Sequence, residues 1–206
     1  MELTRETRWS RHYNDQELQT KFFESKLADG TAAIALDELA AEWPAWDQAA
    51  RLDFCEALPP ARLPHMGDIL RFIMKHGNHE NWSTIGATIV KTLPIEESVP
   101  FLIQACSKCP VGKGANLFKA LALSAAPEAV PTLRQCLERT WGDQTLFDED
   151  VVFDWAAYDA VCLIEFLAQL GDRSAGLREK FKLLSQHHNA LSRQNAINRL
   201  SGFFPG

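Results

Sequence analysis

The sequence predicts an all-α protein, and three observations support this fold class. Apolar residues recur at spacings of three and four over several segments, which is the pattern of an amphipathic helix. Glycine and proline residues are spread evenly, so that most segments between them run about 12 to 18 residues, or three to five helical turns. No segment shows a convincing strand alternation, and no hairpin signal joins two such segments.

The helical spacing is clearest in four segments along the chain. These are residues 47–58, 85–93, 116–125 and 157–171. Helix-breaking residues separate the predicted helices, and short connections follow from their positions. The breakers are Gly30, Pro44, Pro59, Pro60, Pro64, Gly77, Pro94, Pro110, Pro127 and Gly171.

An internal repeat links several of these helices. The segment SVPFL at 98–102 matches AVPTL at 129–133 with an offset of 31 residues, and DILRF at 68–72 has the same apolar spacing one unit earlier. Later units are predicted at 167–184 and 192–204. Repeats of this length are typical of stacked helical hairpins. The region near 141–156 departs from the period by about half a unit.

Two prolines lie four residues apart in the unit around 125–141. A proline in a helix interior costs about 3 kcal/mol, so both need a position near the helix start. We expect Pro127 at the first helical position, a tight single turn over residues 127–130, and Pro131 at a bend where the regular helix begins.

These patterns resemble HEAT repeats. Pro127, Val130, Pro131 and Leu133 fit the opening of a HEAT second helix, residues 168–177 resemble its Leu-Gly-Asp turn, and 192–200 resemble the start of a first helix. The resemblance covers roughly residues 44–204. It implies a right-handed superhelical α-solenoid of antiparallel helix pairs, with about five repeats. We therefore expect one domain, with an N-terminal helical cap over 1–43, repeats over 44–206 and an irregular unit near 141–156.

Composition and the N-terminal segment indicate an ordinary globular protein of the cytoplasm. Apolar residues make up 46% of the chain and charged residues 23%. The first residues carry charges throughout, unlike a signal peptide, and no apolar run reaches the length of a membrane span. Five irregularly spaced cysteines are best interpreted as reduced, mostly buried thiols. We expect a monomer or a weak dimer.

Three motifs bear on possible chemistry. Cys106 and Cys109 form a CxxC pair, and His76 and His79 form an HxxH pair, so a zinc site is conceivable. Their order and spacing match no usual ligand set, and we expect neither a metal nor another cofactor. Gly-Lys-Gly within 111–120 precedes a helix but lacks the full phosphate-loop pattern, which favours a loop cap. The histidines within 187–193 are predicted to face solvent.

Charge is distributed unevenly along the chain. Residues 173–206 carry a net charge of +5, whereas 140–172 contain eight acids and neither lysine nor arginine. With a helix over 151–170 and a core stripe that includes Ala157 and Ile164, Asp154 and Tyr158 lie on one flank and Trp155 and Asp159 on the other. Asp148, Glu149 and Asp150 then favour the helix dipole in its first turn.

Acids mixed with exposed aromatic residues suit an interface for a basic protein. The alternative is a solvated acidic face beside a packed Trp155. The candidate partner-binding residues are Asp148, Glu149, Asp150, Asp154, Trp155, Tyr158 and Asp159.

The sequence favours a protein-binding module over an enzyme. Helical solenoids commonly grip other proteins, and the acidic tract indicates a basic partner rather than nucleic acid. A sharper hypothesis, by analogy of size and charge, is an inhibitor or immunity protein that neutralises a cationic toxin or nuclease. The alternative class is a DNA glycosylase for alkylated bases, in which Trp155 and Asp159 act together; the resemblance to HEAT-like folds allows this. We expect no catalytic residues.

Overall fold

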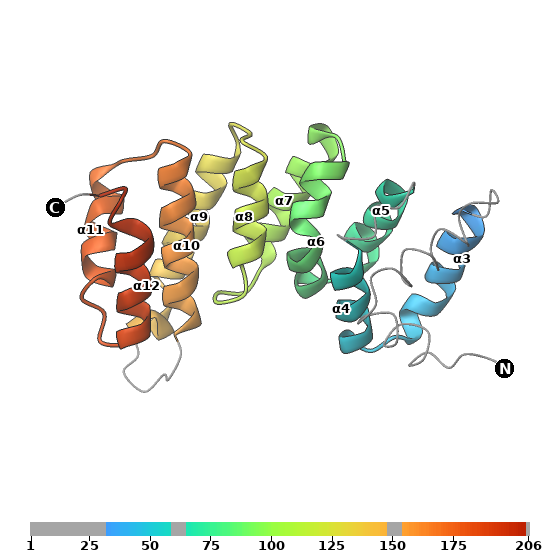
Figure 1. Cartoon of the computed structure of the whole chain (residues 1–206), viewed down its shortest axis with the longest axis horizontal. Coiled ribbons are helices and arrows are strands. Elements are labelled where there is room, and N and C mark those ends of the chain that lie inside the picture. Colours follow the sequence, from blue (N-terminus) through green and yellow to red (C-terminus); the bar gives the residue numbers. More distant parts are fainter. Residues whose placement is uncertain (1–31, 59–64, 148–153, 205–206) are drawn as a thin grey trace. The chain divides into compact units, whose positions relative to one another are not determined.

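The computed structural model describes residues 32–58, 65–147 and 154–204. Over these ranges the chain forms α-helices, 3-10 helices and connecting turns without any strand, which confirms the all-α prediction (Figure 1). The α-helices are α3 (Ala32–Glu42), α4 (Gln48–Ala57), α5 (Met66–His76), α6 (His79–Thr92), α7 (Ile95–Lys108), α8 (Ala115–Leu123), α9 (Ala129–Trp141), α10 (Trp155–Gln169), α11 (Ala175–Leu184) and α12 (Ala190–Leu200).

The chain divides into two compact units between Leu93 and Pro94. In the first unit, α4 and α5 both pack against α6. A 3-10 helix, η1 (Trp43–Ala45), places Trp43 against Trp46, Phe54 and Phe72, with ring centroids 5.7 to 6.1 Å apart. This aromatic cluster is part of the unit's interior, because Trp43, Trp46 and Phe54 are all buried.

The second unit is organised around α10. This helix packs against α8, α9, α11 and α12, and eleven of its 15 residues are buried. A helix that is covered on nearly all sides must be apolar around most of its circumference, and α10 is composed largely of alanine, leucine and other apolar residues. A polar side chain on the covered part of this helix is therefore buried and requires an internal partner.

Helix boundaries follow local capping signals. Asp47 caps α4 by accepting a hydrogen bond from the amide of Ala50 at 2.9 Å, so the predicted segment 47–58 begins with its cap. Asp154 caps α10 in the same way. The predicted start of that helix at residue 151 is therefore wrong by four residues. The irregular unit near 141–156 contains a 3-10 helix, η2 (Gln144–Phe147), between α9 and α10.

The prolines occupy different helical positions from those expected. Pro127 lies in a turn before α9, where the amide of Ala129 donates to the carbonyl of Ala126, so it is not the first helical residue. Pro131 is the third residue of α9, where an amide has no acceptor within the helix. Pro100, its counterpart in the repeat, lies inside α7. The two repeat units therefore begin their helices at different distances from the shared proline.

Ala125, just after α8, has a backbone φ of 51°, in the left-handed region that disfavours residues with a Cβ. We predict that Ala125→Gly raises the free energy of unfolding by about 0.5–1 kcal/mol, since relief of strain exceeds the entropy gained by the unfolded chain. Ala122→Gly, in the last turn of α8, should instead lower it by about 1 kcal/mol. Urea denaturation followed by circular dichroism measures both. A lower free energy of unfolding in Ala125→Gly than in the wild type would contradict the proposed backbone strain at Ala125.

Candidate functional site

The sequence-predicted site residues gather at the start of α10, apart from Asp148, Glu149 and Asp150, which lie outside the described residues. Asp154 is the N-cap of α10, Trp155 is its first residue, and Tyr158 and Asp159 lie one turn further. The four described residues differ sharply in exposure. Asp154 and Asp159 are buried, Tyr158 is half-buried, and Trp155 is exposed.

Asp154 is 2% exposed, so the expectation that it lies on a solvent-facing flank is wrong. One oxygen, Oδ1, accepts a hydrogen bond from the amide of Ala157 at 2.7 Å, as an N-cap does. The other, Oδ2, lies 3.2 Å from Nε2 of His187. Burial raises the pKa of Asp154, while these two neighbours oppose that shift.

His187 is buried at 1% exposure, although the sequence suggested a solvent-facing residue. Its Nδ1 accepts a hydrogen bond from the amide of Asn189 at 3.1 Å, so the ring proton is on Nε2. Nε2 then donates to the carbonyl oxygen of Leu146 at 2.6 Å. His187 therefore joins the end of η2 to the start of α10, on either side of residues 148–153. Of these two adjacent histidines, His188 is the exposed one.

Asp159 is buried at 1% exposure and holds the loop before α8. Its Oδ2 accepts hydrogen bonds from the amides of Gly112 at 2.8 Å and Gly114 at 3.1 Å. The Gly-Lys-Gly segment does bind an anion, and that anion is the protein's own carboxylate. The expectation that Asp159 lies on an exposed flank is therefore wrong. Oδ1 is buried without a hydrogen-bond partner.

The pKa of Asp159 is raised to about 6, because burial outweighs the stabilising amides. The carboxyl of Asp159 binds its proton more tightly in the folded state than in the unfolded state. Protonation therefore contributes stability that is complete below pH 3.8 and is lost as pH rises through 6. We therefore predict that the unfolding free energy of the wild type, relative to Asp159→Asn, increases by about 2–3 kcal/mol from pH 7 to pH 4. Urea denaturation of both proteins across this range tests it. A pH-independent difference would contradict the raised pKa.

Trp155 is the exposed aromatic residue of this region, with 56% of its surface accessible. Its Cβ lies against Gly112, where an added methyl group would come within 2.8 Å and where φ is +81°. The base of the tryptophan is thus anchored on a loop that Asp159 holds in place. Tyr158 meets its ring edge-on with centroids 6.3 Å apart. Of the two interpretations of Trp155, the exposed one agrees with the structure.

Two other acids of the 140–172 segment are paired with arginines of the second unit. Arg134 donates to Asp172 at 2.7 Å, and this guanidinium lowers the pKa of the carboxyl. Arg199 pairs with Glu165 at 2.7 Å. Much of the local charge therefore serves the fold, whereas Asp148, Glu149 and Asp150 lie outside the described residues.

The cysteine and histidine motifs lie at helix ends. Cys106 belongs to α7 and Cys109 follows its last residue, and both thiols are buried. Burial raises the pKa of Cys109 to about 11, which keeps it a thiol. His76 ends α5 and His79 begins α6. Over the described ranges, no three His, Cys, Asp or Glu side chains are grouped so that they could hold a metal ion.

The sequence matches no protein-family model, and neither a curated protein nor a solved structure is detectably similar to it. Among the described helices, none combines the length and apolar character needed to cross a membrane.

Proposed function

We propose that this chain is a protein-binding module that contacts a basic protein through the start of α10. The exposed indole of Trp155 carries this proposal. A large aromatic side chain that packs at its Cβ against Gly112, with 56% of its surface accessible, resembles the anchors that dominate protein interfaces. Three acids, at 148–150, precede it closely in the sequence. Acids around an aromatic anchor complement a basic surface.

A HEAT-like solenoid with right-handed superhelical twist is the proposed scaffold. Contacts in the second unit support it, because α7 packs against both α8 and α9, and α10 packs against both α8 and α12. Helices two apart in the chain therefore lie side by side, as stacked hairpins require. A cytoplasmic inhibitor or immunity protein that neutralises a cationic toxin or nuclease is the specific role we favour.

We do not propose the DNA glycosylase function. It depends on Trp155 and Asp159 acting together on an extruded base. Asp159 is buried, and its Oδ2 accepts the amides of Gly112 and Gly114, whereas Trp155 is exposed. The pair of residues that suggested this alternative is therefore divided between the interior and the surface.

Affinity capture with the full chain, followed by mass spectrometry, would identify the partner, and surface plasmon resonance would test the interface. We predict that Trp155→Ala speeds dissociation about tenfold or more, since a buried anchor governs the off-rate. Reversal of Asp148, Glu149 and Asp150 to lysine should slow association and flatten its salt dependence.

Leu191→Ala is the matched control, because Leu191 is 57% exposed on α12 in the same unit. It should leave the kinetics unchanged. If the Trp155 and charge-reversal variants both keep wild-type kinetics and an intact fold, the interface lies elsewhere. The basic segment 173–206 would then be the next surface to test, with an acidic protein or nucleic acid as partner.

A further inference from the structure

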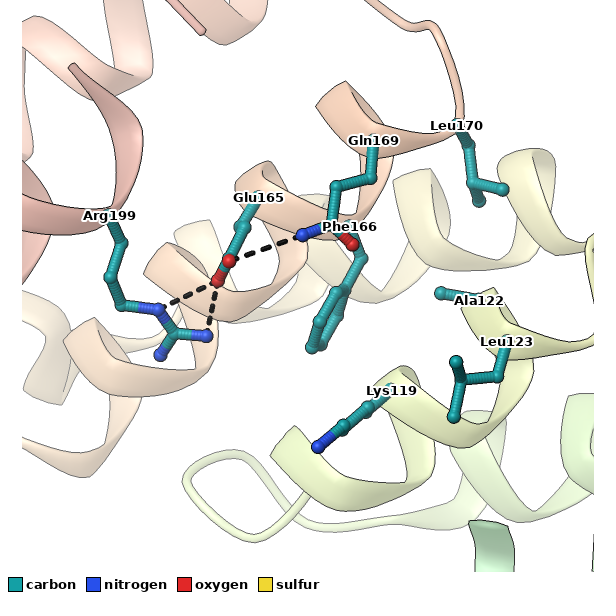
Figure 2. Close-up of a pocket in the computed structure, with 8 residues that line it drawn as sticks. All are labelled: Lys119, Ala122, Leu123, Glu165, Phe166, Gln169, Leu170 and Arg199. Carbon is teal, nitrogen blue, oxygen red and sulfur yellow. Dashed lines mark hydrogen bonds and ion pairs between the residues drawn. The ribbon is translucent and has the colours of Figure 1, made fainter. Parts of the chain in front are cut away.

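A pocket of about 450 Å³ lies in the second unit among side chains of α8, α10 and α12 (Figure 2). Lys119 and Leu123 come from α8, Glu165 and Phe166 from α10, and Arg199 from α12. This volume is within the range that binds small molecules. None of these residues belongs to the proposed protein-binding surface, although the guanidinium of Arg199 lies over the ring of Tyr158, 5.7 Å from its centroid.

One end of the pocket is apolar. Leu123 lies one helical turn after Lys119 on α8, and Leu170 lies one turn after Phe166 on α10. Figure 2 shows both leucines on one side of the pocket, with the Phe166 ring facing them. Leu123 is 53% exposed. An apolar ligand group placed here would remove this exposed leucine surface from water, which is favourable.

The other end carries an excess positive charge. Glu165 is satisfied by its own neighbours, since Oε2 accepts from Nε of Arg199 at 2.7 Å and Oε1 accepts from Gln169 at 3.2 Å. A second nitrogen of the same guanidinium, Nη1, lies 3.1 Å from Sγ of Cys162. Lys119 forms no ion pair with any acid that the structure describes. The charged side chains of the pocket therefore sum to +1.

We infer that this pocket binds a small amphipathic monocarboxylate. The carboxylate would pair with the ammonium group of Lys119, and the apolar body would cover Leu123, Phe166 and Leu170. A single negative charge matches the excess of one positive charge. A dianion, such as a phosphate monoester, would leave one of its two negative charges without a matching cation in the pocket, and removing that unpaired charge from water is unfavourable.

Titration of the ¹⁵N-labelled full chain with octanoate tests this inference by two-dimensional NMR. We expect saturable shifts at the amides of Lys119, Leu123 and Leu170 at millimolar ligand. Lys119→Met, which keeps the side-chain length, should weaken binding at least fivefold, and Lys119→Arg should retain it. Lys108→Met, at an exposed lysine of α7 outside the pocket, is the matched control and should bind like wild type.

Three further ligands separate the alternatives. Octanol that binds as tightly as octanoate would overturn carboxylate recognition, and octyl phosphate that binds more tightly would overturn the monoanion preference. A peptide ending in leucine that binds while octanoate does not would overturn the small-molecule assignment in favour of a peptide carboxylate. Absence of saturable shifts with octanoate, or wild-type affinity in Lys119→Met, would also overturn the inference.

Discussion

Replacing His187 with alanine should lower the free energy of unfolding by about 2–4 kcal/mol. The imidazole provides the donor for the carbonyl of Leu146 and the acceptor for the amide of Asn189, and both groups lose their partner in the variant. Asp154 would keep a buried carboxylate oxygen without the ring beside it. The Phe147 ring, stacked on His187 at 5.2 Å between centroids, would face a cavity.

Urea denaturation followed by circular dichroism measures this change, and hydrogen exchange of the α10 amides locates it. His188→Ala is the matched control, because the neighbouring ring is exposed and its loss should change stability by less than about 0.5 kcal/mol. Equal, small effects of the two substitutions would show that the contacts of His187 contribute little. A large effect without faster exchange at the start of α10 would place the damage elsewhere.

Gly114→Ala should destabilise the protein by about 3 kcal/mol. An added Cβ would lie 2.1 to 2.8 Å from atoms of the Phe118 ring, and this ring is fully buried in a close-packed interior. The backbone of Gly114 is right-handed, with φ of −98°, so an alanine faces no conformational penalty and the cost is steric. The displaced loop would also loosen the hydrogen bond from the amide of Gly114 to Asp159.

Gly176→Ala is the matched control for this substitution. Gly176 lies in α11 with no atom within 4 Å of an added Cβ, so alanine should stabilise its helix by about 0.5–1 kcal/mol. Thermal unfolding monitored by circular dichroism compares the two variants with wild type. Near-wild-type stability of Gly114→Ala would mean that Phe118 can adopt another position, contrary to the packing described above.

Helix positions were largely predictable because their signals are local. Apolar spacing marked the segments that became α4, α6, α8 and α10. Capping was the least predictable feature. The acids at 148–150 looked like the first turn of α10, whereas the helix begins at Trp155 with Asp154 as its cap. Acids at several consecutive positions can interact favourably with the dipole at a helix start. The alternative start positions of the helix therefore differ in free energy by only a few tenths of a kcal/mol to about 1 kcal/mol.

The candidate site was predictable only in part. Trp155 and Tyr158 were placed on the flanks of the predicted helix over 151–170, and the structure finds the tryptophan exposed, at the first position of α10. His187 was missed as a buried residue, since a histidine between two helices has no sequence signal that distinguishes solvent from interior. The partner, and the contribution of Asp148, Glu149 and Asp150 to its binding, stay predictions.

The sequence by itself determined that this chain is helical, where its main helices lie and where its charges fall along the chain. Each of these depends on residues within a few turns of one another. Only the tertiary structure decided which acids face water. Asp159 reads as a surface residue on an isolated helix, but α8, α9, α11 and α12 pack around α10 and bury it against the amides of Gly112 and Gly114. Burial is a property of all the surrounding elements, and an acid enters the interior only where distant backbone groups satisfy its charge.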